Sequence, residues 1–297
     1  MHRAIRACVM NAPRWRGVCM GAARMVTAGM AMGLVLGLMP PARGAETPTP
    51  LTPHRAVYDL TLQSVSGGQI VSASGSMTYV LSDACSAWST QQELNLQTAS
   101  RSGVQTEIRT DYAVLEDKDG GHMVFRTHQY GSGVTEQKIS GEATMTATGG
   151  QVRYTQPGVS VVPLAAGTLF PVAHTRAIIA AGRAGQATIE PVLFDGTTEK
   201  GAIDTFIVLM GWKPPPAQTD IPALAHLGSV ATHVAYYDHA THDMPPDFDI
   251  GMRYFENGVS DRLDMNFGEF RMRGTLRTFT PLPAPHHCSV MVTPHSP

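Results

Sequence analysis

The sequence predicts an all-β fold with one helix, in which a long antiparallel sheet curls its apolar side around a core or cavity. Apolar and polar residues alternate over short stretches along most of the chain, and this period of two is typical of half-buried strands. The 297 residues include 29 glycines and 21 prolines, which suits many short strands joined by turns. A single segment shows helical spacing instead.

The clearest strands lie between residues 249 and 279. Leu263, Met265 and Phe267 alternate with polar residues, and the same pattern resumes at Phe270. Asn257-Gly258 separates two of these runs, and this pair tolerates the positive φ angles of a tight hairpin. The segment therefore predicts a three-stranded antiparallel meander with one apolar face.

Similar runs continue along residues 45–297, with turn residues between them. We expect about a dozen strands in one domain, because no linker divides the chain. The other predicted strands are His54–Leu62, Ile70–Leu81, Ala87–Thr98, Val104–Leu115, Met123–Tyr130, Val134–Ile139, Gly141–Thr148, Gln151–Tyr154, Thr188–Phe194, Ala202–Trp212 and His233–Asp238.

The predicted helix covers Leu169–Gly182. Ala173, Ala177, Ile178 and Ala181 recur near helical spacing, a proline stands close to the start, and a glycine stands at the end. Proline in the first turn and glycine at the end fit helix boundaries. We expect this helix to pack on the concave face of the sheet or to plug an open end.

Residues 1–44 have the pattern of a secretory signal peptide. Several arginines precede an uncharged apolar run from Met25 to Met39, and Ala42-Arg43-Gly44 offers small residues for cleavage. The run is shorter than the roughly 20 residues that span a bilayer, although a retained anchor is the alternative. We therefore expect export to the periplasm.

Removal of residues 1–44 makes the chain acidic. Six of its 22 Lys and Arg residues and none of its 24 acidic residues lie there, so 16 basic residues remain and the net charge is −8. Nucleic-acid binding depends on clustered basic residues, so it is disfavoured. Electrostatic attraction to anionic lipid is disfavoured for the same reason.

Two cysteines, Cys85 and Cys288, remain after cleavage. In an oxidising compartment they most simply form one disulfide. Two free thiols or a redox-active pair is the alternative, although no Cys-x-x-Cys spacing favours redox chemistry.

Several motifs are spread in order over nearly the whole of residues 45–297. They are Pro53–Leu60, Gly75–Tyr79, Cys85, Leu169-Phe170-Pro171, His174-Thr175, Leu193–Gly196, Tyr254–Ser260, Leu282–Pro285 and Cys288. Together these motifs resemble the EipB-like proteins, a periplasmic family of alphaproteobacteria.

The resemblance implies a sheet curled into a β-spiral or open barrel, with one helix and a cavity. It also implies a disulfide, which maps onto Cys85 and Cys288. The implied role is maintenance of cell-envelope integrity, with a periplasmic tetratricopeptide-repeat protein as one candidate partner. No catalytic residue and no cofactor come with it.

A group of histidines and aspartates near residues 226–249 raises the question of a metal. Imidazole and carboxylate groups can hold zinc, but the spacing here matches no recognised zinc pattern. We interpret these residues as solvated turn formers and predict no metal site. The group comprises His226, His233, His239, His242, Asp238, Asp243, Asp247 and Asp249.

No catalytic constellation is predicted either. The serines in Gly258-Val259-Ser260-Asp261 and Gly131-Ser132-Gly133 lack the Gly-x-Ser-x-Gly elbow. His174, on the predicted helix, is interpreted as a packing or hydrogen-bonding residue. There is no phosphate loop and no dinucleotide glycine pattern.

Five arginines fall in the last predicted strands and could receive an acidic partner or an anionic head group. We favour cross-strand pairing with Asp261, Asp264 and Glu269 on a solvated surface. Trp88 and Trp212 are interpreted as core residues. The arginines are Arg253, Arg262, Arg271, Arg273 and Arg277.

The sequence therefore favours a non-enzymatic periplasmic protein that supports cell-envelope integrity. We expect its concave sheet to bind a protein partner, a peptide or a hydrophobic ligand such as a lipid. The alternative is a lipid or lipoprotein carrier that shields acyl chains in the sheet cavity, which rests on fold analogy. Stable membrane insertion is not expected.

Overall fold

The computed structural model describes residues 50–240, 245–285 and 288. These residues belong to one compact unit that spans residues 48–297. The signal peptide predicted at residues 1–44 lies outside the described residues. Within the described part of the chain, no helix is both long enough and apolar enough to cross a bilayer.

Within the described residues, fifteen β-strands form a single sheet, and one α-helix and a short 3-10 helix accompany it. The elements are β1 (His54–Val65), β2 (Ile70–Ala84), β3 (Ala87–Ser100), β4 (Gln105–Asp117), β5 (His122–Tyr130), β6 (Gln137–Thr146), β7 (Gly149–Gln156), β8 (Ser160–Leu164), α1 (Pro171–Arg183), β9 (Thr188–Ile189), β10 (Val192–Leu193), β11 (Ile203–Lys213), η1 (Pro222–Leu224), β12 (Ser229–Asp238), β13 (Phe248–Phe255), β14 (Ser260–Asn266) and β15 (Phe270–Pro281).

The sheet is antiparallel and does not close into a complete barrel. The strand order is β10-β11-β12-β13-β14-β15-β1-β2-β3-β4-β5-β6-β7-β8, and β9 pairs with β11 off this path. Most strands therefore pair with their neighbours in sequence. The exceptions are β1, which also pairs with β15, and β8, which lies at the opposite end of the sheet from β10. The pairing of β1 with β15 places the first and last strands side by side in the middle of the sheet.

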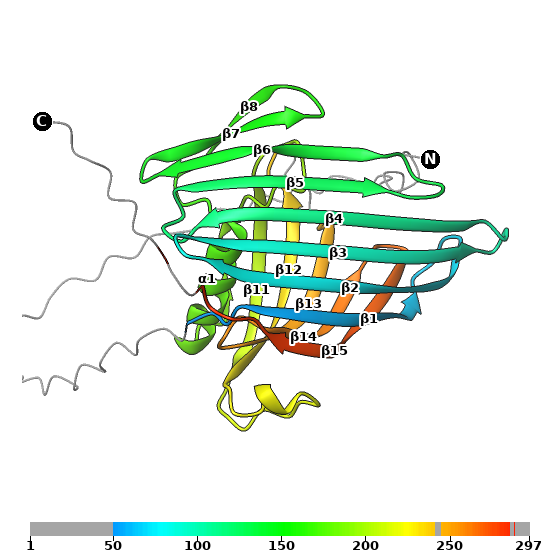
Figure 1. The fold of residues 1–297 in the computed structure, drawn as a ribbon. Helices are drawn as coiled ribbons and strands as arrows, with labels where there is room; N and C mark the ends of the chain where they lie inside the picture. The colour runs from blue at the N-terminus through cyan, green and yellow to red at the C-terminus, as the bar shows by residue number, and fades with distance from the viewer. Residues whose placement is uncertain (1–49, 241–244, 286–287, 289–297) are drawn as a thin grey trace, which may run out of the picture. The chain divides into compact units, whose positions relative to one another are not determined.

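The curl of the sheet produces two layers with α1 between them. In Figure 1, strands β2–β6 run across the view, whereas β11 and β12 pass behind them at a steep angle. One face of α1 packs with β1, β2 and the rear strands through Ile178 and Ala181. Val172 and Ile179 of α1 join a separate cluster with Leu81. The helix therefore packs on the concave face, as predicted.

Burial along the strands follows the alternation in the sequence. In β15, Phe270, Met272 and Leu276 are buried, whereas Arg273 and Arg277 between and beyond them are exposed. Side chains of a strand point alternately to its two faces, so one face of β15 carries the core and the other meets solvent.

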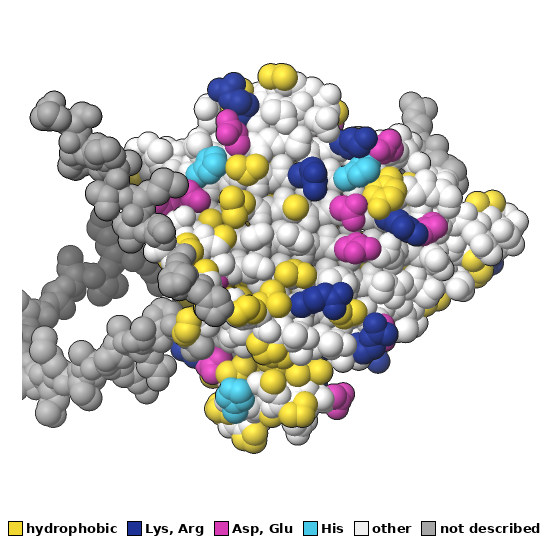
Figure 2. Space-filling model, in the orientation of Figure 1, with side chains coloured by type: hydrophobic (Ala, Val, Ile, Leu, Met, Phe, Trp, Pro, Cys, Tyr) yellow, Lys and Arg dark blue, Asp and Glu magenta, His cyan; other side chains and the backbone are white. Residues whose placement is uncertain are grey.

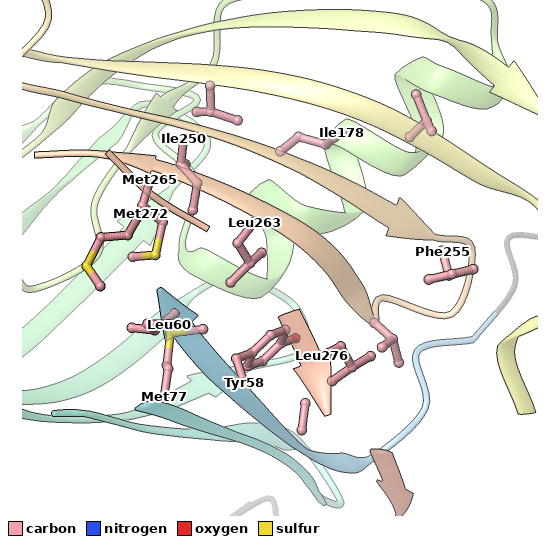
Figure 3. Packing of buried hydrophobic residues seen from close by; sticks show 14 of the residues in the cluster. Tyr58, Leu60, Met77, Ile178, Ile250, Phe255, Leu263, Met265, Met272 and Leu276 are labelled. Carbon is pink, nitrogen blue, oxygen red and sulfur yellow. The ribbon is translucent and has the colours of Figure 1, made fainter. Parts of the chain in front are cut away.

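The buried face of this sheet packs tightly. Figure 3 shows Tyr58 and Met77 from β1 and β2 facing Leu263 and Met272 from the last strands, with Ile178 of α1 approaching them. Apolar burial of this kind contributes about 25 cal/mol per Å² of surface removed from water. The core therefore joins the two halves of the curled sheet through the helix.

The loop between β10 and β11 connects the rear layer to strands β4–β8. The Tyr112 hydroxyl donates to the Asp195 carbonyl at 2.9 Å, and the Tyr154 hydroxyl donates to the Thr198 carbonyl at 2.9 Å. Phe194 packs against the Tyr154 ring edge-on, with 6.4 Å between centroids. These contacts bring the far ends of the open sheet towards each other.

Several predicted boundaries were wrong. The runs Val134–Ile139 and Gly141–Thr148 belong to one strand, β6. The predicted strand Thr188–Phe194 is broken into β9 and β10, because Pro191 between them has no backbone N–H for a ladder. The edge strand β8 was not predicted, because it is short and contains Pro163.

Candidate functional site

A pocket of about 620 Å³ lies at the N-terminal end of α1. The loop before α1, the first turns of α1 and the turns joining β4 to β5 and β6 to β7 form its walls. Leu169, Phe170 and Val172 supply apolar surface, whereas Lys118 and Arg176 supply positive charge. Apolar walls with a few placed polar groups are typical of sites for small molecules.

Glu116, near the end of β4, fixes the start of the helix. Its Oε2 accepts a hydrogen bond from the Val172 N–H at 2.7 Å, and its Oε1 accepts one from the Ala173 N–H at 2.9 Å. Pro171 begins the helix and has no N–H to satisfy. The carboxylate therefore satisfies backbone groups that have no partner within the helix, and its negative charge suits a helix N-terminus.

Glu116 is 2% exposed, and burial changes its acidity. Burial raises the pKa of Glu116 to about 7, although its two N–H donors and the nearby Arg176 charge oppose that rise. His174, one turn along α1, behaves in the opposite way, because burial lowers its pKa to about 4. Glu116 therefore changes charge near neutral pH, whereas His174 stays neutral there.

Trp88 of β3 forms part of the pocket wall, and two cations lie over its ring. The Lys118 Nζ is 4.7 Å from the ring centroid, and the Arg176 Cζ is 5.9 Å from it. Cations are attracted to the face of an indole. Lys118 also forms an ion pair with Asp83 at 2.7 Å. Trp88 is buried, as predicted, but it also lines a pocket.

The disulfide is connected to this pocket through Asp83 and Lys118. Cys85 and Cys288 are joined, with 5.4 Å between their Cα atoms, which confirms the predicted pair. Cys85 lies in the turn between β2 and β3, and its N–H donates to Asp83 Oδ1 at 2.8 Å. The same oxygen pairs with Lys118. A short chain of contacts therefore connects the covalent bond to the pocket.

The concave face, where we expected a ligand, carries packed side chains. Tyr58, Leu60, Phe255 and Met272 are each no more than 1% exposed. Residues of α1 lie against this surface and belong to the same cluster. The end of the sheet beside α1 therefore offers better access for a ligand than its concave centre.

The histidine and aspartate group is spread over separate contacts. Among the residues that the structure describes, no three His, Cys, Asp or Glu side chains are placed to hold a metal ion. His233 lies 3.3 Å from Asp249 across neighbouring strands, and His239 pairs with an aspartate of β11. His242 and Asp243 lie outside the described residues.

Three of the five arginines form cross-strand pairs, as we favoured, but Arg253 and Asp261 are buried and do not lie on a solvated surface. Arg262 instead donates to the Gln218 carbonyl. Figure 2 likewise shows charges of both signs interspersed on the face formed by β1–β6. Glu269, predicted as a partner, instead lies beside Gly68 in the β1–β2 turn. The ion pairs are Arg253 with Asp261, Arg271 with Asp249 and Asp264, and Arg277 with Asp59.

The serines considered for catalysis have structural hydrogen bonds. The Tyr58 hydroxyl donates to the Ser260 carbonyl at 2.8 Å and lies 3.3 Å from the Ser260 Oγ. The Ser132 Oγ accepts from the Glu107 N–H at 3.3 Å. The Nε2 of His174 lies 3.2 Å from a buried threonine hydroxyl, which agrees with its interpretation as a hydrogen-bonding residue.

Sequence reasoning missed Glu116 and Arg176. The predicted strand ends at Leu115, so Glu116 belongs in the following turn by sequence alone. Arg176 resembles any exposed arginine on the polar face of an amphipathic helix. Their roles arise where the end of β4 meets the start of α1, and no local sequence signal marks that meeting.

Comparisons with known proteins agree with this fold. The EipB-like family matches residues 45–283 of the chain. The chain is 26% identical over 241 residues to the cell envelope integrity protein EipB of Brucella abortus (strain 2308), which covers 79% of this chain and 86% of that protein. It is also similar to the crystal structure of a beta-barrel-like protein, a domain of unknown function from Brucella abortus. That match has a TM-score of 0.72 and 24% identity, and it covers 79% of this chain and 99% of the other.

Proposed function

Because the chain belongs to the EipB-like family, we propose that it supports the integrity of the cell envelope and does so by binding, without catalysing a reaction. The observation that carries this proposal is the similarity to the cell envelope integrity protein EipB, which extends over 79% of the chain. The pocket at the N-terminal end of α1 is the proposed binding site.

The proposed location is the periplasm. Two independent features support it: the signal-peptide pattern of residues 1–44 and the disulfide between Cys85 and Cys288. Structural disulfides persist in oxidising compartments and are rare in the cytosol. A carrier that shields acyl chains in the centre of the sheet is less well supported, because packed side chains cover that surface.

Deletion of the gene from its own host tests the envelope role. We expect the deletion strain to grow more slowly than its parent in the presence of a detergent or a wall-directed antibiotic. The wild-type gene should restore growth, whereas a version without residues 1–44 should not, because its product would stay in the cytosol. Equal growth of parent and deletion strain under these stresses would contradict the proposal.

A second candidate function is binding of a protein partner on the outer face of β11. Phe206, Val208 and Met210 point to one side of this strand and are 37%, 37% and 58% exposed. Exposed apolar groups that lie together can mark an interaction surface. Their alternation with buried Ile207 and Leu209 shows that the core does not require them there.

Crosslinking in the periplasm tests this second function. Met210→Asp should abolish a specific crosslinked species, because a charge in an apolar contact is not solvated. Leu115→Asp is the control, since Leu115 is a similarly exposed apolar residue on another strand, 44% exposed. Equal crosslinking in both variants would exclude the β11 face.

A further inference from the structure

The pocket at the start of α1 combines two kinds of surface that one small molecule could contact together. Leu169, Phe170 and Met145 contribute apolar side chains. The guanidinium of Arg176 lies on the same pocket, over the ring of Trp88. An apolar wall beside a cation fits a ligand that has an alkyl or aryl body and an anionic end.

Arg176 differs from the other cation of the pocket. Lys118 is paired with Asp83, so part of its charge is already compensated. Within the described residues, no acidic side chain lies within ion-pair distance of Arg176. Its guanidinium can therefore present two parallel N–H donors to a carboxylate or phosphate, which is the strongest geometry for such a contact.

The helix N-terminus itself does not supply the anion site. The N–H groups of Val172 and Ala173 already donate to Glu116, so a ligand would have to displace a buried carboxylate to reach them. The anionic end of a ligand is therefore placed at the pocket mouth, beside Arg176, and its body is placed against the apolar wall.

We infer that this pocket binds an amphipathic anion, with its carboxylate or phosphate on Arg176 and its apolar body against Leu169 and Phe170. This inference rests on the proposed function, in which the chain acts by binding at this site. The charged groups of the described lining are Arg176, Lys118, Asp119 and Glu116.

Glu116 gives the binding a characteristic pH dependence. Its ionised form repels an anion, and its protonated form does not. Because burial raises the pKa of Glu116 to about 7, affinity should strengthen as the pH falls through this value. Octanoate suits the measurement, since its carboxylate stays ionised between about pH 6 and 8. Glu116→Gln should remove the dependence.

Isothermal titration calorimetry with the exported protein tests the inference. The probes are octanoate and octyl phosphate, which distinguish the two head groups, together with uncharged octanol. Acetate and inorganic phosphate carry the same charged groups without the alkyl chain. We expect one-to-one binding of at least one octyl anion, and much weaker binding of octanol, acetate and inorganic phosphate.

Arg176→Gln should weaken the binding about tenfold, because a charge-assisted contact is lost. Arg183→Gln is the matched control, since Arg183 also lies over an indole but at the other end of α1, and it should bind like the wild type. Melting temperatures of both variants confirm that they are folded.

Three results would overturn the inference: octanol binding as tightly as octanoate, equal weakening by both arginine variants, or the absence of heat with either octyl anion. These failures are separate from failure of the proposed function. A detergent-sensitive deletion strain with no octyl binding would refute the ligand class alone. An insensitive deletion strain would refute the envelope role, whatever the calorimetry shows.

Discussion

Two arginines of α1, Arg176 in its second turn and Arg183 at its C-terminal end, each lie over an indole ring, but they have different neighbours. At the C-terminal end, the Arg183 Cζ is 5.1 Å from the Trp212 ring centroid and its guanidinium forms an ion pair with Glu256. At the N-terminal end, Arg176 lies over Trp88 beside an open pocket. The same contact therefore occurs once beside an ion pair and once beside a pocket, where the described residues place Glu116 near Arg176 but outside ion-pair distance.

The two ends of α1 also differ in how closely their backbone packs against the sheet. A Cβ atom at Gly182 would lie 3.0 Å from the side chain of Val230, so the last turn of α1 packs closely against β12 and a side chain there would crowd Val230. The first turn instead meets the buried carboxylate of Glu116. The comparison indicates that the C-terminal end serves packing, whereas the N-terminal end leaves space for a ligand.

The largest expected effect comes from the disulfide that is connected to the pocket. Cys85→Ser should lower the free energy of unfolding by up to about 5 kcal/mol, because the bond closes a loop of 203 residues in the unfolded chain. Urea unfolding under oxidising conditions measures this. Reductant should lower the free energy of unfolding of the wild type to that of the variant. Equal stability of the two proteins without reductant would contradict the prediction.

The second effect concerns Glu116. Its pKa is raised in the folded state to about 7 from 4.5, so its contribution to stability is full below pH 4.5 and is lost as the pH rises towards 7. The expected loss is about 3 kcal/mol. Glu116→Gln should not show this loss of stability. Urea unfolding of the wild type and the variant from pH 4.5 to 8 measures the difference in their free energies of unfolding.

The comparison with Glu116→Gln also removes the contribution of His174. Burial lowers the pKa of His174 to about 4 from 6.5, so its contribution is present above pH 6.5 and is lost as the pH falls towards 4. That change occurs in both proteins and cancels when one is subtracted from the other. A stability difference that is constant with pH would show that Glu116 does not titrate in this range.

A pair of leucine substitutions tests packing at the two ends. Gly182→Leu should destabilise the protein by about 2 kcal/mol, because the new side chain overlaps Val230. Ala173→Leu should change stability by no more than about 0.5 kcal/mol, because Ala173 faces the pocket. Thermal unfolding measures both, and equal destabilisation would refute the difference between the ends.

The smallest expected effect is a difference in stability between the variants of Arg183 and Arg176. Arg183→Gln should cost about 1 kcal/mol, because it removes a partly buried ion pair with Glu256. Arg176→Gln should change stability less, since among the described residues no acidic side chain lies within ion-pair distance of Arg176 and Glu116 acts on it only from farther away. If Arg176→Gln proves the more destabilising in urea unfolding, the roles assigned to the two arginines are reversed.

The sequence predicts most of the architecture, because alternation and turn residues are local signals. The hairpin at Asn257-Gly258, the helix near Pro171 and the apolar face of β15 all follow from such patterns. The predicted strand boundaries failed where the local sequence signal was weak. Proline breaks the segment that became β9 and β10, and the edge strand β8 is only five residues long.

The candidate site could not be predicted in the same way. Its residues come from strands and loops that are far apart in the sequence. Glu116, for example, accepts a hydrogen bond from the Val172 N–H, which is 56 residues away. Only tertiary packing decides that one arginine has an acidic partner and the other has a pocket. The Cys85–Cys288 bond was predictable because only two of the four cysteines lie beyond residues 1–44 and the family resemblance pairs them.

Fluorescence from single tryptophans tests the central difference most directly. Trp15, Trp88 and Trp212 are the tryptophans of the chain, so Trp15→Phe/Trp212→Phe reports Trp88 alone and Trp15→Phe/Trp88→Phe reports Trp212 alone. During titration with octanoate, we predict a saturable change in Trp88 emission and none in Trp212 emission. A response at Trp212 that equals or exceeds the response at Trp88 would contradict the assignment of the binding site to the N-terminal end of α1.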